Sequence, residues 1–295
     1  MVQSGRDDVC AGLVAAVSAA VNCAFRPPHR AATIRVLRLP VPVGVADSRG
    51  RGLRMSLGDD AGFGDEVNGF LITSRGLDEY RAMFGLGAAD LGGRILDCPA
   101  GAASFAAEVA GFGGDVTACD AAYFEFDGGE VGKMCRDQTD RGDRYVRAQV
   151  GDYCWTFFSD PDDHHRRRRS AVELFVADRQ RNPDRYVPAE LPRLPFPDNA
   201  FDLVLSSHLL FSYADGLGYD FHVRAITELV RVSRGEVRIF PVVPTGSAQL
   251  YPRLDELRGD LLELGITSDL VGVEYEFQKG SDRMMVCRKD PGRSE

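Results

Sequence analysis

The stretch RILDCPAGAASF, residues 94–105, decides the fold. It joins an apolar segment, typical of a buried strand, to a short loop of small residues and then to the start of a helix. A second apolar segment, DVTACD, follows at residues 115–120. Strand, helix and strand within about thirty residues form a βαβ unit, so this region predicts a parallel sheet.

The flanking sequence extends this pattern in both directions. Residues 74–87 carry apolar side chains at helical spacing and end in glycines, which predicts a helix before the first strand. Residues 200–207 predict a strand, 220–233 a helix, and 236–243 a further strand. Residues 270–289 predict an antiparallel hairpin that turns at 279–281. The expected class is therefore α/β, a Rossmann-like, doubly wound and mostly parallel sheet that ends in an antiparallel hairpin.

The organisation along the chain predicts three parts. Residues 1–60 lack sustained periodicity, and we expect a flexible extension there. Residues 61–290 are expected to form the sheet domain. Within it, residues 124–184 are far longer than a simple connection needs, so we expect a largely helical insertion, with one helix at 170–179, that acts as a lid or a substrate-recognition element.

Composition narrows the partners. The 295-residue chain has a net charge of −9 and a pI near 5.2, which argues against nucleic acid and leaves small-molecule chemistry open. Seven scattered cysteines without a C-x-x-C pair predict neither a disulfide framework nor a metal site, and they favour the cytoplasm. The apolar run 10–25 is too short to span a membrane, and acidic residues precede it, so we expect no membrane anchor.

Two aspartates mark a candidate binding edge. Asp97 ends the first predicted strand, Asp120 ends the second, and Gly101 lies in the loop between them. Ligands of open parallel sheets bind at the carboxyl ends of the strands, where small loop residues let them approach the backbone. An acid at the end of the second strand is suited to ribose hydroxyls. Together these residues predict an adenosine-binding site.

The loop departs from the G-x-G-x-x-G pattern of dinucleotide-binding proteins. Two, four and six residues after Asp97 stand Pro99, Gly101 and Ala103. This spacing resembles motif I of the class I S-adenosylmethionine-dependent methyltransferases, which usually has glycine at all three places. The stretch LPRLPFPDNAFDLVLSSHLLFSY, residues 191–213, resembles a second conserved pattern of that family. The resemblance covers residues 66–288 without the insertion and implies a seven-stranded sheet with S-adenosylmethionine as cofactor.

The resemblance also implies roles for the first two strand ends. Asp97, Ala100 and Gly101 would face the methionine part of the cofactor. Asp120 would bind the ribose, and Ala121 would lie against the adenine.

Further cofactor contacts are implied at other positions. Glu190 and Leu191 stand where the family contacts the adenine amino group, while Ser206 and Ser207 would lie next to the sulfonium. Tyr80 would reach the cofactor carboxylate or the substrate.

Two histidines are candidates for the general base. His208 follows the strand that ends in Ser207, and an imidazole with an ordinary pKa near 6.5 suits proton removal at neutral pH. The alternative is that His208 caps the next helix or packs beside Phe211. His222, at the start of the next helix, is the second candidate.

The insertion leaves alternatives open. The run RRRR at 166–169 would attract an acidic substrate, but a solvated helix face is the favoured interpretation, and the adjoining His164 and His165 lack partners at metal-ligand spacing. Aromatic side chains either wall a substrate site or anchor the insertion to the core: Tyr153, Trp155, Phe157 and Phe158.

The sequence thus predicts a methyltransferase that uses S-adenosylmethionine and acts on a small molecule. Two alternatives remain. One is a regulatory protein that binds the cofactor without turnover, suggested by the loss of two loop glycines. The other is a nicotinamide-dependent oxidoreductase, against which the missing glycine pattern and the terminal hairpin both argue.

Overall fold

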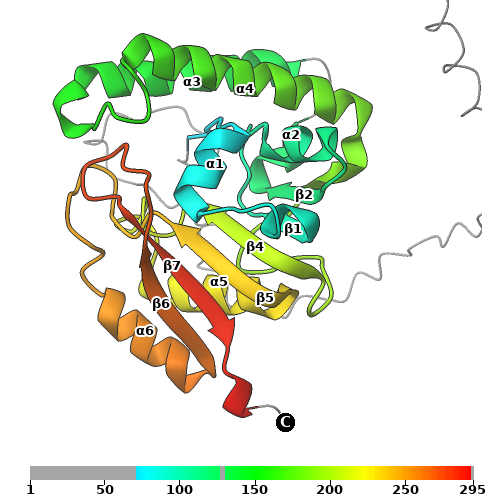
Figure 1. Cartoon of the computed structure of the whole chain (residues 1–295), viewed down its shortest axis with the longest axis vertical. Coiled ribbons are helices and arrows are strands. Elements are labelled where there is room, and N and C mark those ends of the chain that lie inside the picture. The colour runs from blue at the N-terminus through cyan, green and yellow to red at the C-terminus, as the bar shows by residue number, and fades with distance from the viewer. Residues whose placement is uncertain (1–70, 127–129, 294–295) are drawn as a thin grey trace, which may run out of the picture. The chain divides into compact units, whose positions relative to one another are not determined.

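The computed structural model describes residues 71–126 and 130–293. The predicted extension at 1–60 lies outside these residues. Helices and strands alternate over much of the described chain, except that α4 follows α3, β4 follows β3 and β7 follows β6 (Figure 1). Their bounds are α1 Leu77–Phe84, β1 Arg94–Asp97, α2 Phe105–Gly111, β2 Asp115–Asp120, α3 Val131–Ala148, α4 Pro161–Arg181, β3 Tyr186–Pro188, β4 Phe201–Ser207, α5 Tyr219–Val232, β5 Ser233–Phe240, α6 Leu254–Glu263, β6 Ile266–Gly272 and β7 Arg283–Lys289.

The strands form one seven-stranded sheet with the order β3-β2-β1-β4-β5-β7-β6. Neighbouring strands from β3 to β5 run parallel, whereas β7 runs antiparallel to both β5 and β6. The strand order reverses next to β1, because β2 lies on one side of β1 and β4 on the other. The predicted doubly wound sheet with a terminal antiparallel hairpin is therefore confirmed.

Each face of the sheet carries its own hydrophobic core. Residues from α1, α2, α3 and α4 pack on one face with Ile95 and Leu205, and residues from α5 and α6 pack on the other with Leu96 and Val204. Successive strand residues point to opposite faces, so each buried strand supplies side chains to both cores.

Local sequence explains where several helices begin and end. Gly85 follows α1 in the left-handed conformation, as the predicted stop signal requires. α4 begins with Pro161 directly after Asp160, whose side chain accepts a hydrogen bond from the Asp163 backbone N–H at 2.8 Å. The helix expected at 170–179 therefore starts a full nine residues earlier, counting from Ser170 back to Pro161.

The segment between β2 and β3 is built mainly from two long helices. α3 and α4 lie side by side and contribute Val131, Val146, Val172 and Phe175 to the first core (Figure 1). The expected largely helical insertion is therefore present, although α4 was located only in part and no residue range was predicted for α3. Within the described residues, no helix is both long enough and apolar enough to cross a membrane.

Candidate functional site

The carboxyl edge of the sheet gathers the predicted cofactor residues. Asp97 ends β1, Asp120 ends β2 and Ser207 ends β4. Glu190 follows β3, which pairs with the end of β2, and the Ala189 N–H donates to the Asp120 carbonyl oxygen at 3.3 Å. Parallel pairing brings these four positions to one edge, because their strands all end on the same side.

The loop after β1 is fixed by backbone hydrogen bonds. Ala100 N–H donates to the Cys119 carbonyl oxygen at 3.0 Å, and Gly101 N–H donates to Asp120 Oδ2 at 2.8 Å. Gly101 has a φ of +56°, and a Cβ there would lie 2.6 Å from the Thr73 carbonyl oxygen. The retained glycine is therefore required both by its left-handed conformation and by the approach of the 71–76 segment.

Asp120 connects this loop to the next turn. Its Oδ1 accepts a hydrogen bond from the Ala122 N–H at 2.8 Å, which sets the conformation of the half-buried Ala121. Burial raises the pKa of Asp120, while the N–H donors of Ala122 and Gly101 lower it. A carboxylate has about four acceptor sites, so two backbone donors leave room for ribose hydroxyls.

Asp97 is buried and only half satisfied. Tyr80 in α1 stacks on Phe105 at 4.3 Å between ring centroids and donates its hydroxyl to Asp97 Oδ2 at 2.8 Å. Asp97 Oδ1 is also buried, and it has no hydrogen-bond partner. Burial raises the pKa of Asp97 well above its usual range, with the Tyr80 hydrogen bond acting against that shift. Because a buried open acceptor is costly, this oxygen is a candidate for a donor on a ligand.

The two serines of β4 face opposite sides of the sheet. Asp97 is the register partner of Leu205, and Ser207, two residues further on, shares that face. Ser206 points to the other core, where its hydroxyl is buried without a partner. Both serines were expected next to the sulfonium. The alternation of strand side chains allows this position for Ser207 but not for Ser206.

His208 lies on the Asp97 face, directly after β4. Ser207 Oγ and His208 Nδ1 are 2.9 Å apart, and the imidazole packs edge-on to Phe240. Its φ is +50°, and turns rather than a helix follow, so it does not cap a helix. Burial, together with the nearby guanidinium groups of Arg75 and Arg168, holds the pKa of His208 well below its usual range.

His222 is not brought to this edge. It is fully buried in α5, with Nδ1 at 3.0 Å from the Gly218 carbonyl oxygen and Nε2 at 2.8 Å from that of Leu210. A ring whose two nitrogens both face carbonyl oxygens has no free nitrogen for a substrate proton. Its surroundings favour a structural role that joins the turn after β4 to α5.

The remaining predicted residues lie at the edge with different exposures. Ala100 is a buried residue of the loop, Glu190 is exposed, and Leu191 packs in the second core. Glu190 therefore has the freedom to contact a ligand, whereas Leu191 is held by its apolar neighbours.

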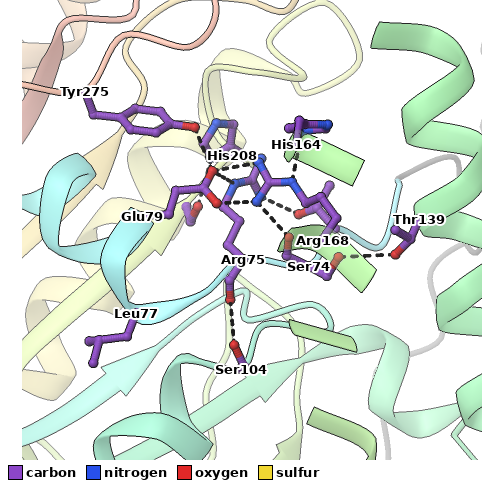
Figure 2. Close-up of polar contacts among 12 residues, drawn as sticks. Ser74, Arg75, Leu77, Glu79, Ser104, Thr139, His164, Arg168, His208 and Tyr275 are labelled. Atoms are coloured by element: carbon purple, nitrogen blue, oxygen red, sulfur yellow. Dashed lines mark hydrogen bonds and ion pairs between the residues drawn. The ribbon is translucent and has the colours of Figure 1, made fainter. Parts of the chain in front are cut away.

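A buried ionic cluster beside the site was missed at the sequence level. Arg168 of α4 makes a bidentate ion pair with Glu79 of α1, and Tyr275 donates its hydroxyl to Glu79 Oε1 at 2.6 Å. Figure 2 shows Arg168 and Tyr275 converging on this carboxylate from different elements, with Arg75 beside it. Arg168 also donates to the Ser74 carbonyl oxygen at 2.8 Å.

This cluster corrects the interpretation of the arginine run as a solvated face. Arg166 and Arg167 are exposed, but Arg168 is buried, and so is His164, whose Nε2 accepts from Arg168 Nε at 3.1 Å. Burial and the positive charge of Arg168 lower the pKa of His164 to about 2. The signal was present, since the buried residues of α4 recur at helical spacing: His164, Arg168, Ala171, Val172 and Phe175.

The aromatic residues of the insertion anchor it to the core. Phe158 is fully buried and meets Phe277 edge-on, while Tyr153 stacks on Phe277 at 4.6 Å between centroids. Phe157 packs edge-on against Tyr275. Of the two alternatives, these contacts favour anchoring between the insertion and the 273–282 connection.

No group of three or more potential metal ligands occurs among residues 71–126 and 130–293.

Residues 168–240 match a family model described as a methyltransferase domain. This segment contains β3, β4, α5 and β5, and it includes the second motif on which the predicted resemblance rests. It speaks against the nicotinamide-dependent alternative.

Among known proteins, an uncharacterized protein of Methanocaldococcus jannaschii is 28% identical over 221 residues, which cover 74% of this chain and 96% of the relative. A solved 1,6-didemethyltoxoflavin-N1-methyltransferase of Burkholderia thailandensis is 16% identical, with a TM-score of 0.37 over 67% of this chain and 71% of that chain. Magnesium protoporphyrin IX methyltransferase of Synechocystis is 12% identical, with a TM-score of 0.37 over 72% and 93%.

Both TM-scores are below 0.5, so the assignment rests on the order of the strands, the motifs and the family model. These agree with the family that the sequence predicts. Residues 168–240 thus match a methyltransferase domain, and the order of the strands agrees with a methyltransferase that uses S-adenosylmethionine.

Proposed function

We propose that the chain transfers the methyl group of S-adenosylmethionine to a small-molecule acceptor at the carboxyl edge of its sheet. The observation that carries the proposal is the hydrogen bond from the Gly101 N–H to Asp120 Oδ2, next to the open buried Oδ1 of Asp97. It joins the two strand ends that a nucleoside bearing an amino-acid tail would bridge.

The residues at this edge fit the parts of the cofactor. Asp97 Oδ1 offers an acceptor to the ammonium group of the methionine part, and Asp120 offers acceptors to the ribose hydroxyls. Ala121 and the exposed Glu190 stand where the adenine would lie. When bound, the cofactor supplies a methyl group already activated by its positive sulfur.

His208 is the proposed base. Its lowered pKa keeps the imidazole neutral at physiological pH, which is the form that accepts a proton. A low pKa also makes it a weak base, so it suits an acceptor whose own proton is acidic. The contact between Ser207 Oγ and His208 Nδ1 orients the ring and leaves Nε2 as the nitrogen that would accept the proton.

Charge and surface chemistry support a small acceptor rather than a nucleic acid. The net charge is −9, and two exposed arginines of α4, Arg166 and Arg167, both contact Asp163. Such paired arginines do not form the open basic surface that phosphate backbones require.

The test combines binding with turnover. Titration calorimetry should detect saturable binding of S-adenosylmethionine and of its demethylated product, and transfer of a labelled methyl group should favour the low-molecular-weight fraction of a cell extract over its protein and RNA fractions. Folded protein that binds neither compound would overturn the proposal.

The variant that tests the base is His208→Asn, because asparagine tolerates the left-handed backbone at this position. We expect kcat to fall by about 10²–10⁴-fold with little change in cofactor affinity. His165→Asn in α4 is the matched control and should retain activity. An unchanged kcat in His208→Asn would remove His208 from the mechanism.

A further inference from the structure

Two buried guanidinium groups share one carboxylate beside the proposed site. The side chains of Arg75, Arg168 and Glu79 are 10%, 9% and 5% exposed. Arg75 lies in the segment before α1, Glu79 lies in α1, and Arg168 reaches them from α4. A buried charge is stable only when it is paired and hydrogen-bonded, so the partners of each group matter.

Glu79 is fully engaged by other residues. Both of its carboxylate oxygens accept hydrogen bonds from Arg168, and Oε1 accepts a third from the Tyr275 hydroxyl at 2.6 Å. Arg75 Nε lies 3.3 Å from the same oxygen, but it is buried and makes no hydrogen bond. Its Nη1 donates to Thr73 Oγ1 at 2.5 Å. Arg75 thus gains only part of what a carboxylate partner would provide.

No other described acid completes the pairing of Arg75. Asp97 is close enough for the two charges to interact, yet its Oδ1 has no hydrogen-bond partner. Burial and the repulsion from Arg168 lower the pKa of Arg75, which is the response expected of a cation with too little compensating negative charge.

The backbone holds Arg75 against the cofactor loop. The Thr73 carbonyl accepts from the Ala102 N–H, and the Arg75 carbonyl accepts from the Ser104 N–H, each at 2.9 Å. The Arg75 charge also acts on the His208 imidazole, across the carboxyl edge. A group bound by Arg75 would therefore lie between the loop after β1 and the proposed base.

We propose that Arg75 is an oxyanion-binding residue whose guanidinium takes a carboxylate, because Arg168 and Tyr275 take the hydrogen bonds of Glu79 and leave Arg75 with an ion pair at 3.3 Å but no hydrogen bond to it. The inference rests on the proposed function and deepens it. The carboxylate has two possible sources, the amino-acid tail of the cofactor and an acidic methyl acceptor. A planar guanidinium binds either one in the same two-point geometry.

The experiment compares Arg75→Gln with Arg81→Gln, which removes an exposed arginine from the same helix region. Calorimetry measures the binding of S-adenosylmethionine and of its decarboxylated form. Nuclear magnetic resonance then measures the binding of carboxyl-labelled benzoate to the ligand-free and to the cofactor-saturated protein. Circular dichroism checks folding, and Arg75→Lys, which keeps the charge but loses the fork, replaces Arg75→Gln if that variant does not fold.

If the cofactor supplies the carboxylate, Arg75→Gln lowers the affinity for S-adenosylmethionine at least tenfold and changes the affinity for the decarboxylated form by no more than about twofold. If the acceptor supplies it, both cofactors bind as in the parent, and benzoate binds the cofactor-saturated parent and Arg81→Gln but not Arg75→Gln. Equal behaviour of Arg75→Gln and Arg81→Gln in all titrations would overturn the inference. A parent that fails to bind the cofactor would contradict the proposed function instead, and benzoate binding to the ligand-free protein would still decide the role of Arg75.

Discussion

Asp97 at the carboxyl edge of the sheet and Arg168 in the α3–α4 insertion are both buried, but their polar atoms are used in opposite ways. At the edge, Asp97 Oδ1 stays open in a buried setting. In the insertion, Arg168 is buried and fully occupied by Glu79, Ser74 and His164. Unsatisfied buried groups are costly, whereas a satisfied ion pair can hold two elements in a fixed arrangement. Asp97 Oδ1 is therefore available to a ligand, whereas the Arg168 guanidinium holds the structure around the site in place.

The largest expected effect concerns the buried ion pair between Arg168 and Glu79, which joins α4 to α1. Arg168→Met leaves the Glu79 carboxylate buried without its main partner, and we expect a loss of about 3 kcal/mol in the free energy of unfolding. This is the lower end for a broken buried pair, because Arg75 remains 3.3 Å from Glu79. Urea denaturation measures the change.

The control for Arg168→Met is Arg166→Met, two residues away on the exposed face of the same helix. Arg166 pairs with Asp163 at 2.6 Å, but its side chain is 67% exposed, so we expect a change below about 1 kcal/mol. Equal losses in the two variants would mean that the buried cluster does not brace the insertion.

The next effect tests the loop at the edge. Gly101→Ala places a Cβ 2.6 Å from the Thr73 carbonyl at a φ of +56°, so we expect about 2 kcal/mol of destabilisation and weakened cofactor binding. Gly113→Ala, with a φ of +89° and open space around the added Cβ, carries the conformational cost alone. Thermal unfolding and calorimetry compare the two. Normal cofactor affinity in folded Gly101→Ala would contradict the assignment of this loop.

The smallest expected effect concerns the burial of the His164 imidazole beside Arg168. His164 has a pKa of about 2 in the folded protein and near 6.5 when unfolded, so below pH 6.5 the unfolded chain binds the extra proton. The stability that this group contributes is complete above pH 6.5 and falls by about 1.4 kcal/mol per unit as the pH decreases.

His164→Gln should therefore flatten the decline in unfolding free energy between pH 6.5 and 5, as measured by urea titrations at matched pH. Asp97 has a raised pKa, so it contributes stability that is lost as the pH rises. The slope of unfolding free energy against pH is therefore compared between the variant and the parent. His165→Gln is the control on the same helix. An unchanged slope in His164→Gln would show that His164 is protonated in the folded state.

The elements nearest the opening motif were predictable because local periodicity and burial agree there. β1, β2 and β4 fall within the expected segments, and α2 follows the loop as expected. α5 is displaced by one residue at each end, and the terminal hairpin is present with β6 beginning four residues before the expected range. α3 was missed because its charged sequence hides a narrow buried stripe of Val131, Cys135, Thr139 and Val146. The three-residue β3 is too short to carry a pattern of its own.

For the site, the sequence identified the ends of strands but not the contacts between them. Asp97, Gly101 and Asp120 followed from their positions after apolar segments. Arg75 could not be found this way, because its significance depends on Glu79 being occupied by Arg168, a residue 89 positions further along the chain from Glu79.

The sequence by itself determined the class of sheet and the acids at its carboxyl edge, because apolar periodicity and strand ends are local properties of the chain. Only the tertiary structure decided which of four consecutive arginines is buried, which of two adjacent serines faces the site, and which histidine lies at the edge. Those outcomes depend on what lies across a helix or sheet face, and free energies of burial and pairing are fixed by neighbours that are distant in sequence.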